Sequence, residues 1–225
     1  MPRTRYTPPP ETVVLRKALA DALKTRDNEG RVVASATHGV YLFYDYDGEP
    51  IYVGQTYEKL SARIGRHLTN QRTDAVAMNV LDPFEVAEIE MWPFFELVRL
   101  PPEQAKGILN KAEYTVFRRA VDASAHHAIL NEGDIAPTDM IGLPPSVRVR
   151  IVPPEYFEVR RHPDTRIARR ASTIAALARV ISERQVSKGL RRTLLTQAKR
   201  LEHLACERLG ESDEPIPTEN QDEEQ

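Results

Sequence analysis

Cysteine is almost absent from this 225-residue chain, which carries Cys206 alone. A single cysteine can form neither an internal disulfide nor a cysteine-rich zinc site. Long apolar runs are also missing, because no stretch approaches the roughly 20 residues that span a bilayer. The basic start MPRTRYTPPP lacks the apolar core of a secretory signal. These absences argue against a disulfide scaffold and a membrane protein, and we expect a cytoplasmic protein with no membrane partner.

Acidic and basic residues are unevenly distributed, although the net charge is only −2. Residues 211–225 contain seven acids and no base, a composition that predicts disorder. Residues 160–200 hold twelve Arg or Lys against two acids, Asp164 and Glu183. Such a segment can neutralise phosphates in a nucleic-acid complex. It can equally be the solvated face of ordinary helices, and both interpretations stay open.

The spacing of apolar residues predicts an α+β fold with a small three-stranded antiparallel sheet flanked by helices. The expected helices of this part span 11–27, 57–71 and 103–121, and the expected strands span 37–46, 50–56 and 84–92. Two amphipathic helices, 165–185 and 188–210, follow a proline-punctuated stretch in which VRVRIV has strand character. We therefore predict five parts: an N-terminal arm and helix (1–35), a central domain (36–135), a proline-rich connector (136–163), a basic helical hairpin (164–210) and a disordered acidic tail (211–225).

The two expected strands 37–46 and 50–56 form a hairpin whose turn fixes the register. If Asp47 and Gly48 are the central residues of a type I′ turn, Tyr41 and Tyr52 lie on one face, with Gly54 opposite Tyr41. The missing side chain of Gly54 would then leave space for a ligand. The expected cross-strand pairs are Tyr46–Glu49, Phe43–Tyr52 and Tyr41–Gly54. The other, core-facing side would hold Val40, Leu42, Tyr44, Ile51 and Val53.

Polar residues with chemical potential recur after the hairpin. Arg63 and His67 are four residues apart and share one face of a helix. An arginine binds phosphate oxygens bidentately at any relevant pH, and a histidine donates or exchanges protons. Lys59 and Arg66 would extend this positive surface.

Glu113 stands against the apolar stripe of the helix 103–121. A buried carboxylate is costly unless it is paired or bound to a metal, so a structural salt bridge and a metal site are both open. Asn131 follows a short apolar run, where it could orient a water molecule or, more commonly, cap a turn.

Five of these elements occur in a fixed order within residues 36–135. They are GVY at 39–41, YVG at 52–54, the pair Arg63 and His67, the helical Glu113, and Asn131. This order resembles the GIY-YIG nuclease family, with valine in place of isoleucine in both signatures. The resemblance implies a sheet of three antiparallel strands flanked by helices and a metal-dependent nuclease site.

The resemblance also assigns roles to these residues. Glu113 is expected to bind one divalent ion, Mg²⁺ or Mn²⁺, and Arg63 to lie near the scissile phosphate. A phenol with a pKa near ~10 is a poor base unless a cation lowers it. We therefore expect Arg63 and the metal to activate Tyr41 as general base, while Tyr52 positions the water or the phosphate. Supporting roles fall to His67 and Asn131.

The sequence thus predicts a metal-dependent endonuclease that hydrolyses DNA, with a role in restriction, defence or repair. The alternative is a non-cleaving nucleic-acid-binding or protein-interaction module that keeps the fold. The expected outer faces of the last two helices concentrate Arg169, Arg170, Arg179, Arg184, Arg191, Arg192 and Lys199. These helices would contact DNA or form a homodimer. The expected substrate contacts are Gly54, Lys59, Arg66, Arg169, Arg170, Arg191 and Arg192.

Overall fold

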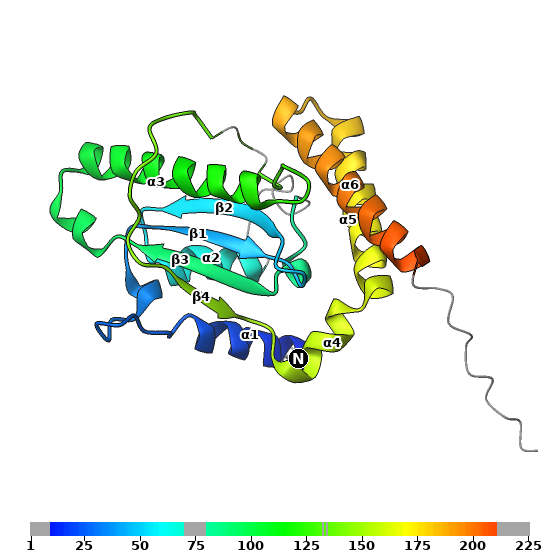
Figure 1. The fold of residues 1–225 in the computed structure, drawn as a ribbon, viewed down its shortest axis with the longest axis horizontal. Helices are drawn as coiled ribbons and strands as arrows, with labels where there is room; N and C mark the ends of the chain where they lie inside the picture. Colours follow the sequence, from blue (N-terminus) through cyan, green and yellow to red (C-terminus); the bar gives the residue numbers. More distant parts are fainter. Residues whose placement is uncertain (1–9, 70–79, 132, 134, 211–225) are drawn as a thin grey trace, which may run out of the picture.

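The computed structural model describes residues 10–69, 80–131, 133 and 135–210 (Figure 1). The predicted acidic tail and the N-terminal arm before Pro10 lie outside the described residues. The architecture is α+β, as predicted. Its main elements are α1 (Pro10–Ala22), β1 (Gly39–Tyr44), β2 (Pro50–Thr56), α2 (Leu60–Leu68), β3 (Glu88–Pro93), α3 (Pro102–Ala123), β4 (Val147–Arg150), α4 (Pro154–Arg161), α5 (Pro163–Glu183) and α6 (Lys188–Gly210).

The sheet has four antiparallel strands in the order β2-β1-β3-β4, so the expectation of three strands was one too few. The added strand, β4, pairs with β3 through Ile89 and Val149. It lies inside the segment 136–163. Four residues between proline-containing stretches give only a short alternating pattern, which is why the sequence marked VRVRIV as strand-like without assigning it to the sheet.

The β1–β2 register confirms the predicted pairs Phe43–Tyr52 and Tyr41–Gly54. The predicted turn was wrong, because Asp45 and not Tyr46 pairs with Glu49. The Asp45 carboxylate accepts the backbone N–H groups of Asp47 (2.9 Å) and Glu49 (3.1 Å), which stabilises a longer turn. The register consequently shifts between Phe43 and Tyr44.

Ile51 shows the consequence of this shift. It packs with the apolar cluster of the face that carries Tyr41, and not with Val40, Leu42 and Val53 as the two-residue turn predicted. A one-residue change in register reverses the face to which a strand residue points.

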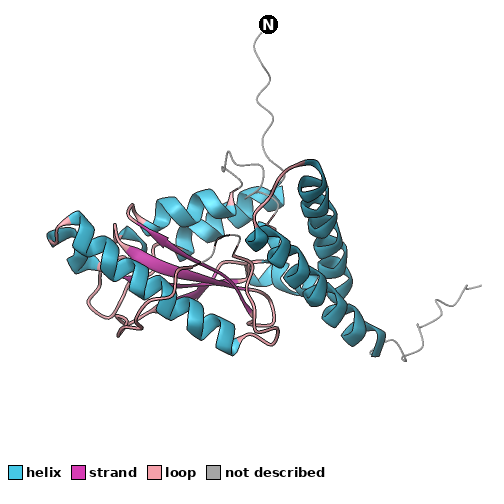
Figure 2. Ribbon diagram, turned by 90° about the horizontal axis from the view of Figure 1, so that it is seen from above, coloured by secondary structure: helices cyan, strands magenta, loops and turns pink. Residues whose placement is uncertain are grey.

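Helices cover both faces of the sheet (Figure 2). Helix α3 begins at a proline pair and lays one stripe on the first face, where Leu109, Ala112 and Val116 pack with Val40 and Val53. The second face packs residues of α1 and α2 together with Leu177 of α5 and Leu190 of α6. No described helix is both long and apolar enough to span a membrane.

The α5–α6 hairpin is joined to the sheet by a buried group of charged residues, here called the ionic cluster: Asp45, Glu85, Arg166, Arg170 and Arg200. One oxygen of Asp45 accepts hydrogen bonds from all three arginines, at 3.0, 3.1 and 2.5 Å respectively. Arg170 also donates to Glu85 at 3.0 Å. These contacts hold both C-terminal helices against the β1–β2 turn.

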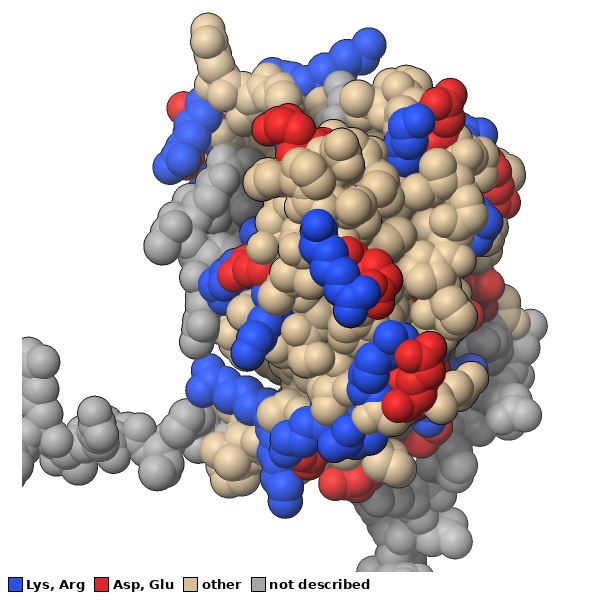
Figure 3. All heavy atoms as spheres, turned by 90° about the vertical axis from the view of Figure 1, so that its left-hand side faces the viewer, with Lys and Arg blue, Asp and Glu red and all other residues tan. Residues whose placement is uncertain are grey.

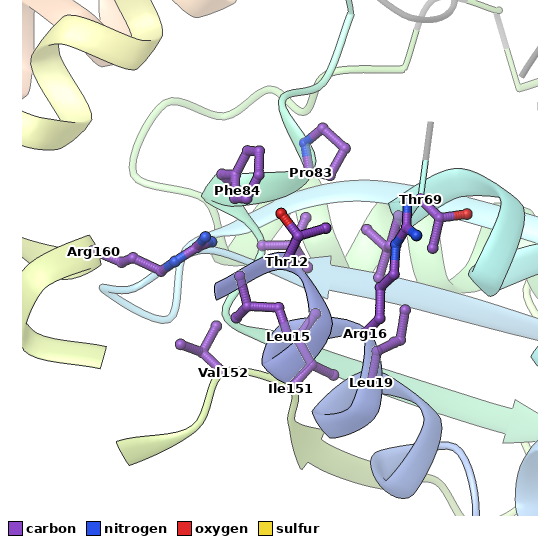
Figure 4. A pocket seen from close by; sticks show the side chains of 12 residues that line it. Thr12, Leu15, Arg16, Leu19, Thr69, Pro83, Phe84, Ile151, Val152 and Arg160 are labelled. Carbon is purple, nitrogen blue, oxygen red and sulfur yellow. The ribbon is translucent and has the colours of Figure 1, made fainter. Parts of the chain in front are cut away.

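An apolar pocket of about 170 Å³ lies between α1, the 3-10 turn Pro83–Glu85 and the residues after β4 (Figure 4). Leu15, Phe84 and Ile151 line it, and Arg160 at its edge is paired with Glu11 at 2.8 Å. Its lining shares no residue with the predicted site. We interpret it as imperfect packing of α1 and place the chemistry elsewhere.

Candidate active site

A polar cleft opens along the outer edge of β2, between that strand, α3 and residues 131, 133 and 135–138. Its volume is about 670 Å³. It brings together Tyr52, Gly54, Arg63, Glu113 and Asn131 from the predicted site. Residues far apart in the sequence, such as Val53 and Asn131, thus meet at the outer edge of β2, because β2 ends the sheet.

Tyr41, Tyr52 and His67 form an aromatic group on one face of the sheet, behind this edge. Tyr41 is fully buried (0% exposed), and its hydroxyl lies 3.4 Å from Nε2 of His67. The Tyr41 and Tyr52 rings are 6.4 Å apart, and the His67 ring lies 5.2 Å from that of Tyr52. The hairpin register and the helical spacing together bring these three predicted residues into contact.

Gly54 is required for a different reason than predicted. A Cβ atom at this position would lie 2.4 Å from the hydroxyl oxygen of Tyr41, far inside van der Waals contact. The space opposite Tyr41 is therefore filled by the Tyr41 phenol itself and not by a ligand. The Gly54 backbone still lines the cleft, so the Tyr41 hydroxyl lies over the strand edge without an intervening side chain.

Arg63 is half-buried and projects from α2 toward the phenols. Burial opposes its charge, but the phenol oxygens of Tyr41 and Tyr52 more than offset this, and the pKa of Arg63 is raised. Its buried Nε has no hydrogen-bond partner among the described residues. Buried donors are nearly always satisfied, so this N–H suits an incoming acceptor such as a phosphate oxygen.

Glu113 enters the cleft from α3. Burial raises the pKa of its carboxyl group to about 7, against the opposing effects of the Gln55 side chain, the Arg63 charge and the Gln55 backbone amide. Within the part of the chain that the structure describes, no cation reaches salt-bridge distance of Glu113. The alternative of a structural salt bridge is therefore not realised there.

The donor set of the cleft fits a hard divalent cation bound by few protein ligands. The described residues contain no group of three or more His, Cys, Asp or Glu that could hold a metal, so a closed structural site is not seen among them. Mg²⁺ typically binds one or two carboxylates and keeps waters and substrate phosphates as its other ligands. One under-neutralised carboxylate in an open cleft matches that preference.

Asn131 uses its side chain on the strand edge. Its Nδ2 donates to the Val53 carbonyl at 2.8 Å, and its Oδ1 accepts from the Val53 N–H at 3.1 Å. Leu130 adds a backbone bond to Ile51 at 2.8 Å. Asn131 thus fixes the segment that follows α3 along β2, and it lines the cleft.

The remaining predicted substrate contacts lie outside the cleft lining. Arg66 is ion-paired with Glu58, and Lys59 is an exposed residue just before α2. Arg169 lies 3.7 Å from Asp82 and over the Phe84 ring, while Arg191 and Arg192 are exposed on α6.

Arg170 is the clear correction among these arginines, because it is 5% exposed and belongs to the ionic cluster rather than to an outer face. Amphipathic spacing places it on the inner side of α5, where a long charged side chain can reach a buried acid. The sequence did not reveal this inward position, because Arg170 stands among several arginines of the same helix.

Two polar residues that line the cleft, Gln55 and Asn110, were not predicted, nor was Tyr57 beside them. Gln55 follows the second signature, and Asn110 lies one helical turn before Glu113; the Gln55 amide donates to Asn110 Oδ1 at 2.9 Å. Tyr57 is half-exposed, and its hydroxyl lies 3.4 Å from both amide oxygens. Only their positions could have indicated them in the sequence. Gln55 directly follows Gly54 on the strand, and Asn110 lies three residues before Glu113 on the same helix.

The central part of the chain is similar to a known family. Residues 37–101 match the family model described as the GIY-YIG catalytic domain. The search of curated proteins and the search of solved structures return no match. The matched segment contains both signatures, Arg63 and His67, and it ends before α3, so the placement of Glu113 and Asn131 beside it comes from the structure.

Proposed function

Because residues 37–101 match the catalytic domain of the GIY-YIG family, a family of nucleases, we propose that this protein is a metal-dependent endonuclease that hydrolyses DNA phosphodiesters. The observation that carries the proposal is Glu113. It is a carboxylate with a raised pKa, without a salt-bridge cation among the described residues, in a cleft that it shares with Arg63 and Tyr52.

The proposed division of labour uses the positions of these side chains in the cleft. Glu113 would hold one Mg²⁺ or Mn²⁺, which supplies Lewis-acid stabilisation of charge on the phosphoryl oxygens when bound. Arg63 offers its unsatisfied Nε–H to the same phosphate and stabilises negative charge on the adjacent phenols. Tyr52 lines the cleft and positions the phosphate or the attacking water.

Tyr41 is the proposed general base. Its hydroxyl lies over the Gly54 backbone at the cleft and 3.4 Å from His67 Nε2. The neighbouring Arg63 cation would stabilise the phenolate form of Tyr41, and His67 would accept the phenol proton. Because Tyr41 is 0% exposed, the attacking water would have to enter beside the Gly54 backbone for a phenolate at this position to take its proton. His67 is thereby a positioning and proton-holding residue for Tyr41.

The decisive experiment measures cleavage of supercoiled plasmid and linear duplex DNA with Mg²⁺, with Mn²⁺ and with chelator. We expect the unmodified chain to cleave only with metal, and Glu113→Gln to cleave at least about 10³-fold more slowly, because several kcal/mol of charge stabilisation are removed. DNA binding should persist in that variant, since the metal ligand is not a phosphate contact.

Glu103→Gln is the matched control, because Glu103 is an exposed carboxylate near the start of the same helix. It should cleave at the rate of the unmodified chain. Metal-dependent cleavage that survives Glu113→Gln at a near-normal rate would reject the assignment of Glu113, and no cleavage by the unmodified chain with either metal would reject the nuclease itself.

A further inference from the structure

The arginines and lysines of the α5–α6 hairpin divide into two groups with different tasks. Arg166, Arg170 and Arg200 point inward and are paired with Asp45 and Glu85 in the ionic cluster. Four exposed cations at and beside the turn between the helices, here called the tip cations, are not part of this cluster: Arg179, Arg184, Lys188 and Arg191.

The tip cations are not neutralised by their surroundings. Among the described residues no acid lies within salt-bridge distance of any of them, and Glu183 is the only acid between 179 and 191. The opposite end of the same hairpin is balanced, since Arg208 pairs with Asp164 at 3.0 Å and His203 lies 3.2 Å from Glu207. Positive charge is therefore polarised toward one end of the hairpin.

The far side of the molecule provides a contrast. Figure 3 shows the end that lies to the left in Figure 1, where basic and acidic side chains are interspersed. Cations of the loop after α1 and of the 3-10 turn Phe95–Arg99 are paired, for example Lys24 with Asp21 at 2.8 Å and Arg99 with Glu96 at 2.6 Å. The tip cations differ from these paired residues because four of them lie close together with no acid at salt-bridge distance among the described residues.

The polarised end of the hairpin lies beside the cleft. The hydroxyl of Thr193, in the second turn of α6, donates to the Asn131 carbonyl at 3.3 Å, and Asn131 lines the cleft. A polyanion whose phosphate occupies the cleft at Arg63 would thus continue toward the start of α6. The buried ionic cluster fixes this arrangement, because it holds both helices of the hairpin against the β1–β2 turn.

We infer that the tip of the α5–α6 hairpin is a second contact surface for duplex DNA, which binds backbone phosphates on one side of the scissile bond. The inference rests on the proposed nuclease function of the cleft and adds a direction to it: the duplex runs from the cleft toward Lys188 and Arg191. Arg179 on α5 and Arg184 directly after it extend the surface. The binding is electrostatic and independent of base sequence.

The test measures binding of a fluorescent duplex by anisotropy over a range of salt concentrations, without metal, in the Glu113→Gln chain. A triple variant removes three tip charges (Arg184→Gln, Lys188→Gln, Arg191→Gln). The matched control removes three exposed charges from α1, the loop after it and the turn Phe95–Arg99 (Lys17→Gln, Lys24→Gln, Arg99→Gln). The two variants have the same net charge, so a difference between them depends on position.

We expect the tip variant to lower the slope of log affinity against log salt by up to about 0.9 for each phosphate that is no longer neutralised, roughly 2 to 3 in all, while the control keeps the slope. In the otherwise unmodified chain, the same tip variant should raise KM for cleavage and change kcat little. Equal slopes for the tip and control variants, or no duplex binding at all, would overturn the inference. Because binding is measured without catalysis, its outcome is separate from the presence or absence of cleavage that decides the proposed function.

Discussion

Two regions of this molecule bury charged side chains, and they neutralise them in different ways. In the ionic cluster, three arginines surround one oxygen of Asp45. Glu85, Asp47 and Glu49 add the remaining negative charge around them. In the cleft, burial raises the pKa of Glu113 to about 7, because the hydrogen bonds from Gln55 and the charge of Arg63 only partly stabilise its carboxylate. A buried charge with opposite charges around it holds the fold together, whereas one without them is available to an external cation.

The comparison also separates residues that look alike in the sequence. Arg63 and Arg170 both lie on amphipathic helices beside apolar residues. The Nε of Arg170 is bonded to Glu85 at 3.0 Å, whereas the Nε of Arg63 has no partner among the described residues. Arg166 Nε and Arg200 Nη1 also lack a hydrogen bond among the described residues, but they lie 3.7 and 3.8 Å from the carboxylates of Glu85 and Glu49. A carboxylate beside the guanidinium, rather than residue type or burial, therefore distinguishes the structural arginines from the one proposed to bind substrate.

The largest effect should come from the ionic cluster. Replacement of Asp45 by Ala leaves three buried arginines without their shared acceptor, and breaking a buried pair costs about 3–5 kcal/mol. We expect a decrease of that size in the free energy of unfolding, measured by urea denaturation. Asp139→Ala, which removes an exposed partner of Lys111, should cost less than about 1 kcal/mol. Similar decreases in both variants would show that the ionic cluster does not stabilise the fold more than an exposed ion pair does.

The next effect tests the phenols of the cleft. Tyr41→Phe and Tyr52→Phe should each slow cleavage by at least about 10²-fold, the lower end for general acid–base groups, with little change in stability. Tyr46→Phe is the control, since its hydroxyl bonds to the Phe84 carbonyl outside the cleft at 3.1 Å. Normal cleavage by both variants would show that the two hydroxyl groups have no catalytic role and that the tyrosines only pack against the sheet.

A smaller effect should distinguish the two buried carboxylates, because removing the charge of Asp45 should destabilise the fold whereas removing the charge of Glu113 should stabilise it. The folded pKa of Glu113, about 7, lies above its ordinary value of 4.5, so burial of its charge costs stability as the pH rises above 4.5, and the full cost is reached above pH 7. Without metal at pH 8, the free energy of unfolding of Glu113→Gln should therefore exceed that of the unmodified chain by about 1–3 kcal/mol.

The measurement is denaturation of both chains from pH 4 to pH 8. The difference should close near pH 4, where the carboxyl group is protonated in both states, and Mg²⁺ should stabilise only the unmodified chain. A Glu113→Gln variant that is less stable at pH 8 would place Glu113 with the structural charges, beside Asp45.

The smallest effect concerns charge at the surface. Deletion of residues 211–225 removes seven acids and no base, which lowers the repulsion of a polyanion and should tighten duplex binding a few-fold at low salt, with no difference at high salt. The control replaces these acids by their amides at unchanged length. If the amide tail binds like the unmodified chain, charge is not the cause. Neither change should move the unfolding transition, in contrast to Asp45→Ala.

Much of the fold and part of the site followed from local sequence rules. The period of two along a strand and the spacing of four along a helix were sufficient to bring Tyr41, Tyr52 and His67 together. The apolar stripe of α3 was sufficient to direct Glu113 inward. These features depend on residues close in the sequence, so their signal is strong.

The remaining features depend on partners that local rules do not contain. Asp45 reshapes its turn through side-chain hydrogen bonds, and this moved Ile51 to the other face. Arg170 donates to Glu85, which lies 85 positions away in the sequence. Asn131 donates to Val53, which lies 78 positions away. A long polar side chain has many candidate partners, and only the three-dimensional arrangement selects one.

The separation between Asp45 and Arg200 has a consequence for how the protein is made. These two residues are 155 positions apart, and the chain leaves the ribosome from its N-terminus. Both signatures and Glu113 are synthesised well before the arginine that completes the neutralisation of Asp45. We expect a nascent or prematurely terminated chain to remain incompletely folded, so that the proposed cutting activity, which would endanger the genome of its host, arises only when translation has passed α6.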